Sequence, residues 1–183
     1  MNLWSLPVSA QLSAGELPHV TDFREVLPVL QLLGDESRPV WLRWYMALAL
    51  FYRRPVPPEA ETEAMEYLSD FLTCGDRGRP GPKLLDWQLD AGEIVSDVNA
   101  VAGREIRSLP YLHWWSFLSF FHGIREGRLS TLVSLRDKLR RGQKLEPWEQ
   151  DYAHRNPDKV RLRPPETDED LAHRRMLEQL LRN

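Results

Sequence analysis

The sequence predicts an all-α protein: a single compact bundle of about six to eight helices with an extended N-terminal arm and a separate C-terminal helix. Two observations lead to this prediction. Apolar residues recur at helical spacing in successive segments that glycine and proline separate. The 183 residues are 42% hydrophobic and include 7 Trp, so they can build a sizeable core. We expect a helical core domain over residues 1–155, whose arm is 1–19, and a linker plus C-terminal helix over 156–183.

The arm carries only a weak strand signal. Trp4, Leu6 and Val8 alternate with other residues, which is typical of a strand. Pro7 and Pro18 bound this pattern, and proline cannot donate to a ladder of backbone hydrogen bonds. We therefore expect an extended arm that docks on the helices.

Two helices are predicted after the arm. Asp22 followed by Glu25 three residues later is the pattern of a capping box, so the first helix begins there and Gly34 ends it. Pro28 lies inside this helix and predicts a kink. The second helix, over 37–53, is apolar nearly all round, which is typical of a helix at the centre of a fold.

The next two helices are separated by a loop. A helix over 58–73 has acidic residues in its first turns, where the helix dipole favours them. Residues 75–82 are rich in Gly and Pro and predict a loop. Asp86 is the expected N-cap of a fourth helix that ends before Gly103.

The fifth helix, 111–122, carries the largest concentration of aromatic residues in the chain. Each aromatic ring buries about 150–250 Å² when it is enclosed. We therefore expect this helix to dominate the core and Gly123 to end it. Its apolar residues are Trp114, Trp115, Phe117, Leu118, Phe120 and Phe121.

The last third of the chain is more polar. Helices are expected over 130–141 and from Pro147 onward, followed by a proline-containing linker over 156–165. A terminal helix over 167–182 has a leucine stripe flanked by charges, and it can pack on its own domain or bind a partner chain. The stripe consists of Leu171, Leu177, Leu180 and Leu181.

Composition excludes several classes of protein. A net charge of −3 and a pI near 6.0 argue against a nucleic-acid-binding protein. The single cysteine, Cys74, excludes an internal disulfide framework and a CxxC metal site. The longest apolar stretch, 41–52, is too short for a membrane span, and no secretory signal is recognisable. We expect a soluble cytoplasmic protein without nucleic-acid or membrane partners.

Catalytic and cofactor motifs are also lacking. There is no phosphate-binding loop, no GxSxG and no HExxH spacing, so we expect no enzyme, no cofactor and no metal. Cys74 lies at a helix end that would not lower its pKa. The remaining enzyme alternative is a site built from Asp86, Asp90 and His113, which would require the three side chains to line one cleft.

Three stretches carry a resemblance to a known family. They are DFREVL at 22–27, PKLLDWQLD at 82–90 and YLHWWSFL at 111–118. In this order they resemble the bacteriophage gene-product-fifteen family of tailed phages and prophages, over about residues 20–155. The resemblance implies a non-catalytic role in phage morphogenesis, in the cytoplasm of the host bacterium.

Within that role, the resemblance favours a tail-assembly chaperone. Such a protein would bind the long helical tape-measure protein, together with a companion tail-assembly protein, while tube subunits polymerise. The alternative is a virion structural component, such as a tail completion or connector subunit, which would stay in the mature particle.

A chaperone for a long apolar helix needs repeated apolar surfaces, and oligomerisation supplies them by avidity. We therefore expect a homo-oligomer that uses helices 37–53 and 167–182 for binding. The expected partner-binding residues are Trp41, Trp44, Leu171, Leu177, Leu180 and Leu181.

Overall fold

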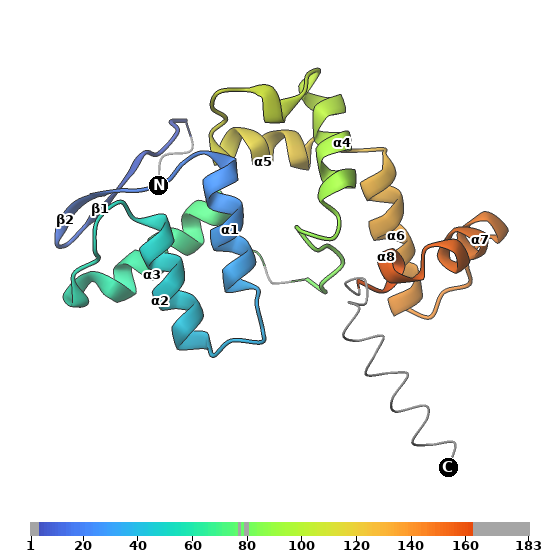
Figure 1. Cartoon of the computed structure of the whole chain (residues 1–183), viewed down its shortest axis with the longest axis horizontal. Helices are drawn as coiled ribbons and strands as arrows, with labels where there is room; N and C mark the ends of the chain where they lie inside the picture. The colour runs from blue at the N-terminus through green and yellow to red at the C-terminus, as the bar shows by residue number, and fades with distance from the viewer. Residues whose placement is uncertain (1–3, 77, 79–80, 163–183) are drawn as a thin grey trace, which may run out of the picture.

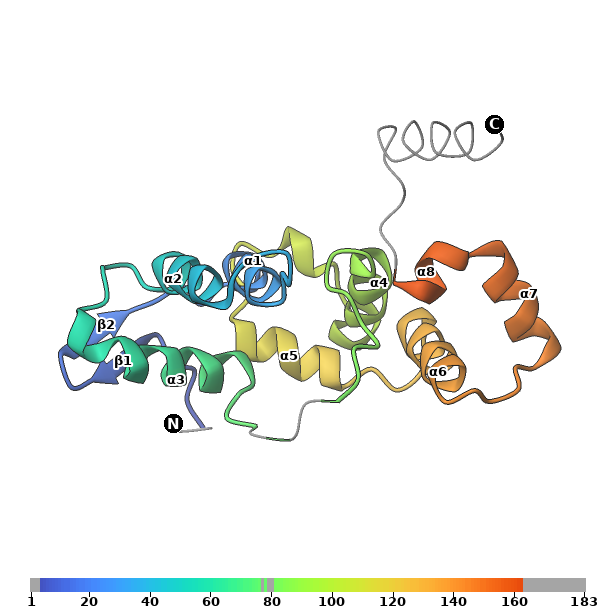
Figure 2. The same ribbon diagram turned by 90° about the horizontal axis from the view of Figure 1, so that it is seen from below.

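The computed structural model describes residues 4–76, 78 and 81–162 (Figure 1). Within them, the elements follow the order β1 (Ser9–Leu12), β2 (Gly15–Pro18), α1 (Phe23–Leu33), α2 (Val40–Phe51), α3 (Glu61–Leu72), α4 (Ala91–Ala102), α5 (Trp114–His122), α6 (Arg128–Arg140), α7 (Pro147–Arg155) and α8 (Pro157–Arg161). Figure 2 shows α1 and α2 in one layer above α3 and α5, with the strands at one end and α6 to α8 at the other.

The prediction of an all-α fold is wrong, because the expected arm forms an antiparallel β-hairpin. β1 pairs with β2 in a register that sets Ser9 opposite Pro18 and Leu12 opposite Gly15. Gly15 has a φ of 107°, a left-handed conformation that glycine adopts without a steric cost. The fold is therefore mostly helical with a small sheet at its N-terminus.

The first strand of the hairpin begins at Ser9, just after the alternating residues that indicated a strand. Trp4, Leu6 and Val8 are exposed, whereas Ala10 and Leu12 of β1 are buried in the main core. The strands are short and their turn lacks the Asn-Gly or Asp-Gly pair that makes hairpins recognisable. Tertiary contacts with α3 stabilise the hairpin instead.

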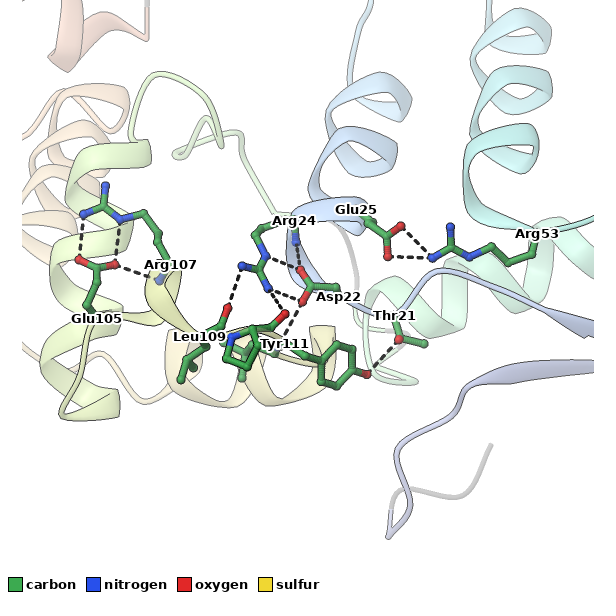
Figure 3. A network of polar contacts seen from close by, with 11 residues as sticks. Thr21, Asp22, Arg24, Glu25, Arg53, Glu105, Arg107, Leu109 and Tyr111 are labelled. Atoms are coloured by element: carbon green, nitrogen blue, oxygen red, sulfur yellow. Dashed lines mark hydrogen bonds and ion pairs between the residues drawn. The ribbon is translucent and has the colours of Figure 1, made fainter.

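Asp22 caps α1, as predicted, and also ties it to the chain segment before α5. One carboxylate oxygen accepts from the Arg24 backbone N–H at 3.0 Å, and the other accepts from the Leu112 N–H at 3.0 Å. The Arg24 guanidinium donates to both carboxylate oxygens at 2.7 Å and to the Leu109 carbonyl at 2.9 Å (Figure 3). The start of α1 is therefore fixed to a segment far away in the sequence.

Two other helices begin later than expected, and the same physical reason applies to both of them. Asp35 accepts from the Ser37 N–H at 3.1 Å in a local turn, and α2 begins only after Pro39. Asp86 accepts from the Gln88 and Leu89 N–H groups at 3.0 Å in a turn that precedes α4. In both places a carboxylate stabilises a turn before the helix rather than the helix itself.

The aromatic helix α5 occupies the core, as predicted. Trp114, Trp115, Phe117 and Leu118 are all buried. The Trp114 indole N–H donates to the Leu72 carbonyl at 3.1 Å, and the Trp115 indole N–H donates to the Phe71 carbonyl at 2.9 Å. These carbonyls lie in the last turn of α3, where helical carbonyls lack partners of their own. The two indoles therefore join α5 to α3 without leaving a polar atom unpaired.

The second half of the molecule is held by a buried ion pair. Arg136 of α6 donates to both carboxylate oxygens of Asp90, at 2.6 and 2.8 Å, and the two side chains are only 3% and 1% exposed. The same guanidinium donates to the Leu84 carbonyl at 2.9 Å and to the Lys159 carbonyl at 3.1 Å. Arg136 therefore joins α4, α6, α8 and the segment before α4.

The expected linker over 156–165 is helical in its first part. α8 covers Pro157–Arg161, and Val160 packs with Leu132 and Leu135 in a second small core. The expected C-terminal helix over 167–182 lies outside the described residues.

We expect that replacing Arg136 by methionine destabilises the protein by about 3–5 kcal/mol, because it leaves the Asp90 carboxylate buried without a cationic partner. Urea denaturation followed by circular dichroism measures the loss. The matched control is Arg155→Met, which removes an exposed ion pair with Asp151 and should cost less than about 1 kcal/mol. Equal stabilities of the two variants would contradict the role given to Arg136.

Candidate protein-binding surface

The structure separates the two tryptophans of α2 that the sequence assigned to partner binding. Trp41 is 69% exposed, whereas Trp44 is half-buried and packs against the main core. The four leucines predicted to act with them, Leu171, Leu177, Leu180 and Leu181, lie outside the described residues. Of the two expected binding residues that the structure describes, Trp41 is the one on an accessible surface.

α2 is also less central than its composition predicted. It buries Ala47, Leu48 and Phe51 against the rest of the molecule. An apolar stripe on its other side remains exposed and consists of Trp41, Tyr45 and Ala49. These residues are four apart, so they lie on one face of the helix. Tyr45 is 66% exposed, and the sequence analysis missed both Tyr45 and Ala49 because every face of this helix is apolar.

The stripe leads into a groove of about 500 Å³ at the C-terminal end of α2. The groove forms where the chain leaves α2 in an extended, proline-rich segment and returns into α3. Its lining is mostly apolar and includes three charged side chains. The lining residues are Tyr45, Leu48, Ala49, Tyr52, Arg53, Arg54, Pro55, Val56, Pro58 and Glu61.

Hydrogen bonds hold the walls of this groove in place. The buried Tyr52 hydroxyl donates to the Ala64 carbonyl at 3.0 Å, which fixes the end of α2 to α3. Arg53 donates to both Glu25 carboxylate oxygens, at 2.8 and 2.9 Å (Figure 3). Arg54 is exposed and forms no ion pair with any residue that the structure describes. The groove is thus preformed. Among the described residues, the guanidinium of Arg54 has no carboxylate partner, so it can bind an acidic group of a ligand.

The residues of the enzyme alternative are all engaged in holding the fold. Asp90 binds Arg136 and accepts from the Asp86 N–H at 2.9 Å. His113 caps α5, because its Nδ1 accepts from the Trp115 N–H at 3.0 Å while its Nε2 donates to the Pro7 carbonyl at 2.9 Å. Both ring nitrogens therefore have partners in the neutral form.

The described part of the chain shows no cluster of three or more His, Cys, Asp or Glu side chains that could hold a metal ion. Burial raises the pKa of the Cys74 thiol to about 11, so this cysteine is a neutral thiol near pH 7. No helix among the residues 4–76, 78 and 81–162 has the length and apolar character of a membrane span.

Buried His19 joins the hairpin region to the core. Its Nδ1 donates to the Val20 carbonyl at 2.8 Å, and its ring stacks on Phe51 with centroids 4.6 Å apart. Its Nε2 lies 3.0 Å from the Tyr67 hydroxyl, whose oxygen is also 2.9 Å from the Ser9 carbonyl oxygen of β1, so the one phenolic proton bonds to one of these two acceptors at a time. Burial lowers the pKa of His19 to about 4, and this effect outweighs the opposing hydrogen bond to Val20.

Comparisons of this chain with protein-family models, with curated proteins and with solved structures found no match. Function is therefore inferred from the residues and from the geometry of the α2 surface.

We expect stability to fall as the pH is lowered from 7 to 5, in part because of His19. Its pKa is about 4 in the folded protein and near 6.5 when unfolded, so the unfolded state takes up a proton first and gains stability. The contribution is fully present above pH 6.5 and about 2 kcal/mol of it is lost at pH 5. Urea denaturation at several pH values measures this loss.

His19→Gln should flatten this pH dependence, although the variant is less stable at pH 7. His154→Gln, which replaces an exposed histidine of α7, is the control and should keep the wild-type slope. A wild-type slope in His19→Gln would mean that His19 is not the group that titrates.

Proposed function

We propose that the protein is a non-catalytic phage morphogenesis protein that acts as a tail-assembly chaperone and binds the tape-measure protein. The observation that carries this proposal is the exposed apolar face of α2, formed by Trp41, Tyr45 and Ala49 beside a preformed groove. The resemblance of the segments at 22–27, 82–90 and 111–118 to the gene-product-fifteen family supports the phage setting.

Helix-in-groove recognition accounts for the chemistry of this face. An amphipathic partner helix presents apolar residues at positions i, i+4 and i+7, and it can align with the stripe on α2. Exposed aromatic side chains are common among the residues that dominate binding energy, because they are large and lose little conformational entropy. A tape-measure protein is long and helical, so it offers many such segments in succession.

Weak contacts suffice for this task. A chaperone has to keep an apolar helix from aggregating and then release it as tube subunits polymerise. Reversible binding by several copies along one chain meets both needs, because avidity multiplies the individual affinities. We place this activity in the cytoplasm of the host bacterium, with a companion tail-assembly protein as a further partner.

We expect Trp41→Ala combined with Tyr45→Ala to abolish binding of the tape-measure protein from the same phage. Each truncation of an interface aromatic costs about 1–2 kcal/mol, so the pair should weaken binding by about 30-fold to 800-fold. Co-expression followed by affinity purification measures the amount of tape-measure protein that is retained.

Trp148→Ala is the matched control, because Trp148 is also exposed, at 56%, but lies on α7 at the other end of the molecule. It should leave retention unchanged. Equal retention by all variants would contradict the proposed surface. Mass spectrometry of purified particles separates the two phage roles, since a chaperone is absent from them and a connector or completion subunit is present.

A further inference from the structure

We propose that the groove at the C-terminal end of α2 binds the segment 163–183 of a second copy of this chain. The groove adjoins the apolar stripe of α2, and its lining carries charges of both signs. The proposal rests on the groove and on the sequence of that segment, and it does not depend on the tape-measure protein.

The groove is lined by apolar residues together with two basic residues and one acidic residue. Leu48, Val56 and Pro58 line the interior. Arg53 and Arg54 follow the last turn of α2, and of these Arg54 has no ion pair within the described residues. Glu61, the first residue of α3, also lines the groove, and Glu59 nearby is exposed. A ligand that fits should be apolar along one side, with acidic residues followed by basic ones or the reverse.

The segment 163–183 has this composition. After Arg163 and two prolines it carries an acidic run that contains Glu166 and the residues 168–170, and Arg174 and Arg175 then precede a leucine-rich stretch. The acidic run can face Arg54 while the arginine pair faces the glutamates at the start of α3. The predicted leucine stripe, formed by Leu171, Leu177, Leu180 and Leu181, then supplies the apolar side.

The occupant comes from a second copy because of where the described chain ends. Leu162 follows α8, which packs on α6 in the second core. Both views of the molecule place α1 and α4 between α8 and α2 (Figures 1 and 2). The few residues between Leu162 and the acidic run would have to pass both helices to reach the groove of their own chain, whereas a neighbouring copy has no such constraint.

This contact joins unlike surfaces of two copies, so it is heterologous. An open assembly has a free groove at one end and a free segment at the other, whereas a ring has neither. Copies therefore add head to tail, into a ring or a filament. Each added copy brings the exposed Trp41 and Tyr45 of its own α2 into the same array. Such an array provides the multiple weak sites that avidity requires.

The test uses two full-length variants, each of which breaks one half of the contact. Ala49→Glu places a carboxylate in the groove at an exposed helical position, so folding should be unaffected. Leu177→Asp disrupts the predicted leucine stripe. Mass photometry over a range of concentrations measures the oligomers of each variant and of their equimolar mixture.

We expect the wild-type protein to form oligomers that grow with concentration and each variant alone to self-associate at least about tenfold more weakly. The mixture should form 1:1 heterodimers and no larger species, because only the intact groove of Leu177→Asp and the intact segment of Ala49→Glu can meet. Leu50→Glu is the matched control and should associate like the wild type, because Leu50 is 51% exposed before substitution but lies about 100° round the helix from Ala49 and does not line the groove.

Several outcomes would overturn the proposal. A monomeric wild type would do so, and so would a mixture that fails to form heterodimers. Normal oligomers of Ala49→Glu would show that the segments pair with one another rather than with the groove. Because no tape-measure protein is present in this assay, its outcome is independent of the co-purification experiment above.

Discussion

Burying the indoles of α5 sets the arrangement of the main core. A buried indole N–H that lacks an acceptor is costly, and Trp114 and Trp115 bring two of them into the core within one turn of helix. Their acceptors are the Leu72 and Phe71 carbonyls in the last turn of α3. This pairing joins the C-terminal end of α3 to the start of α5 in one layer, while α1 and α2 form the other (Figure 2). α2 packs on α1 and α3 through one side only, so its remaining apolar face has no cover among the described residues.

In the second half of the molecule, hydrogen bonds of charged side chains contribute more to the packing of the helices than apolar contacts do. The helices α6 to α8 bury few apolar residues, and α4 holds them through charges instead. Arg136 pairs with Asp90, while Asp97 of α4 accepts from the Leu129 N–H at the start of α6 at 2.8 Å. Bidentate and charge-assisted hydrogen bonds are directional, so they fix the position of α6 more specifically than apolar contact would. The molecule thus combines an aromatic core at one end with a polar junction at the other.

The sequence was sufficient to predict that most of the helices exist. It was less sufficient to predict where each helix begins and which of its faces is exposed. α1 begins at the N-cap Asp22 and α4 ends at Gly103, as the capping patterns predicted. Caps depend on local hydrogen bonds and on backbone conformation, so the sequence indicates them. The hairpin was missed because its strands are stabilised by α3 and not by a recognisable turn. Trp44 was assigned to the binding surface together with Trp41, since a helix that is apolar on every face does not reveal which face is buried.

By itself, the sequence determined that an aromatic helix over 111–122 lies in the core of a mostly helical protein, because so much aromatic area cannot remain in water. The tertiary structure alone decided which face of α2 stays exposed. It also decided that Asp90 and His113 serve the fold, because their partners come from distant parts of the chain and no local pattern specifies them.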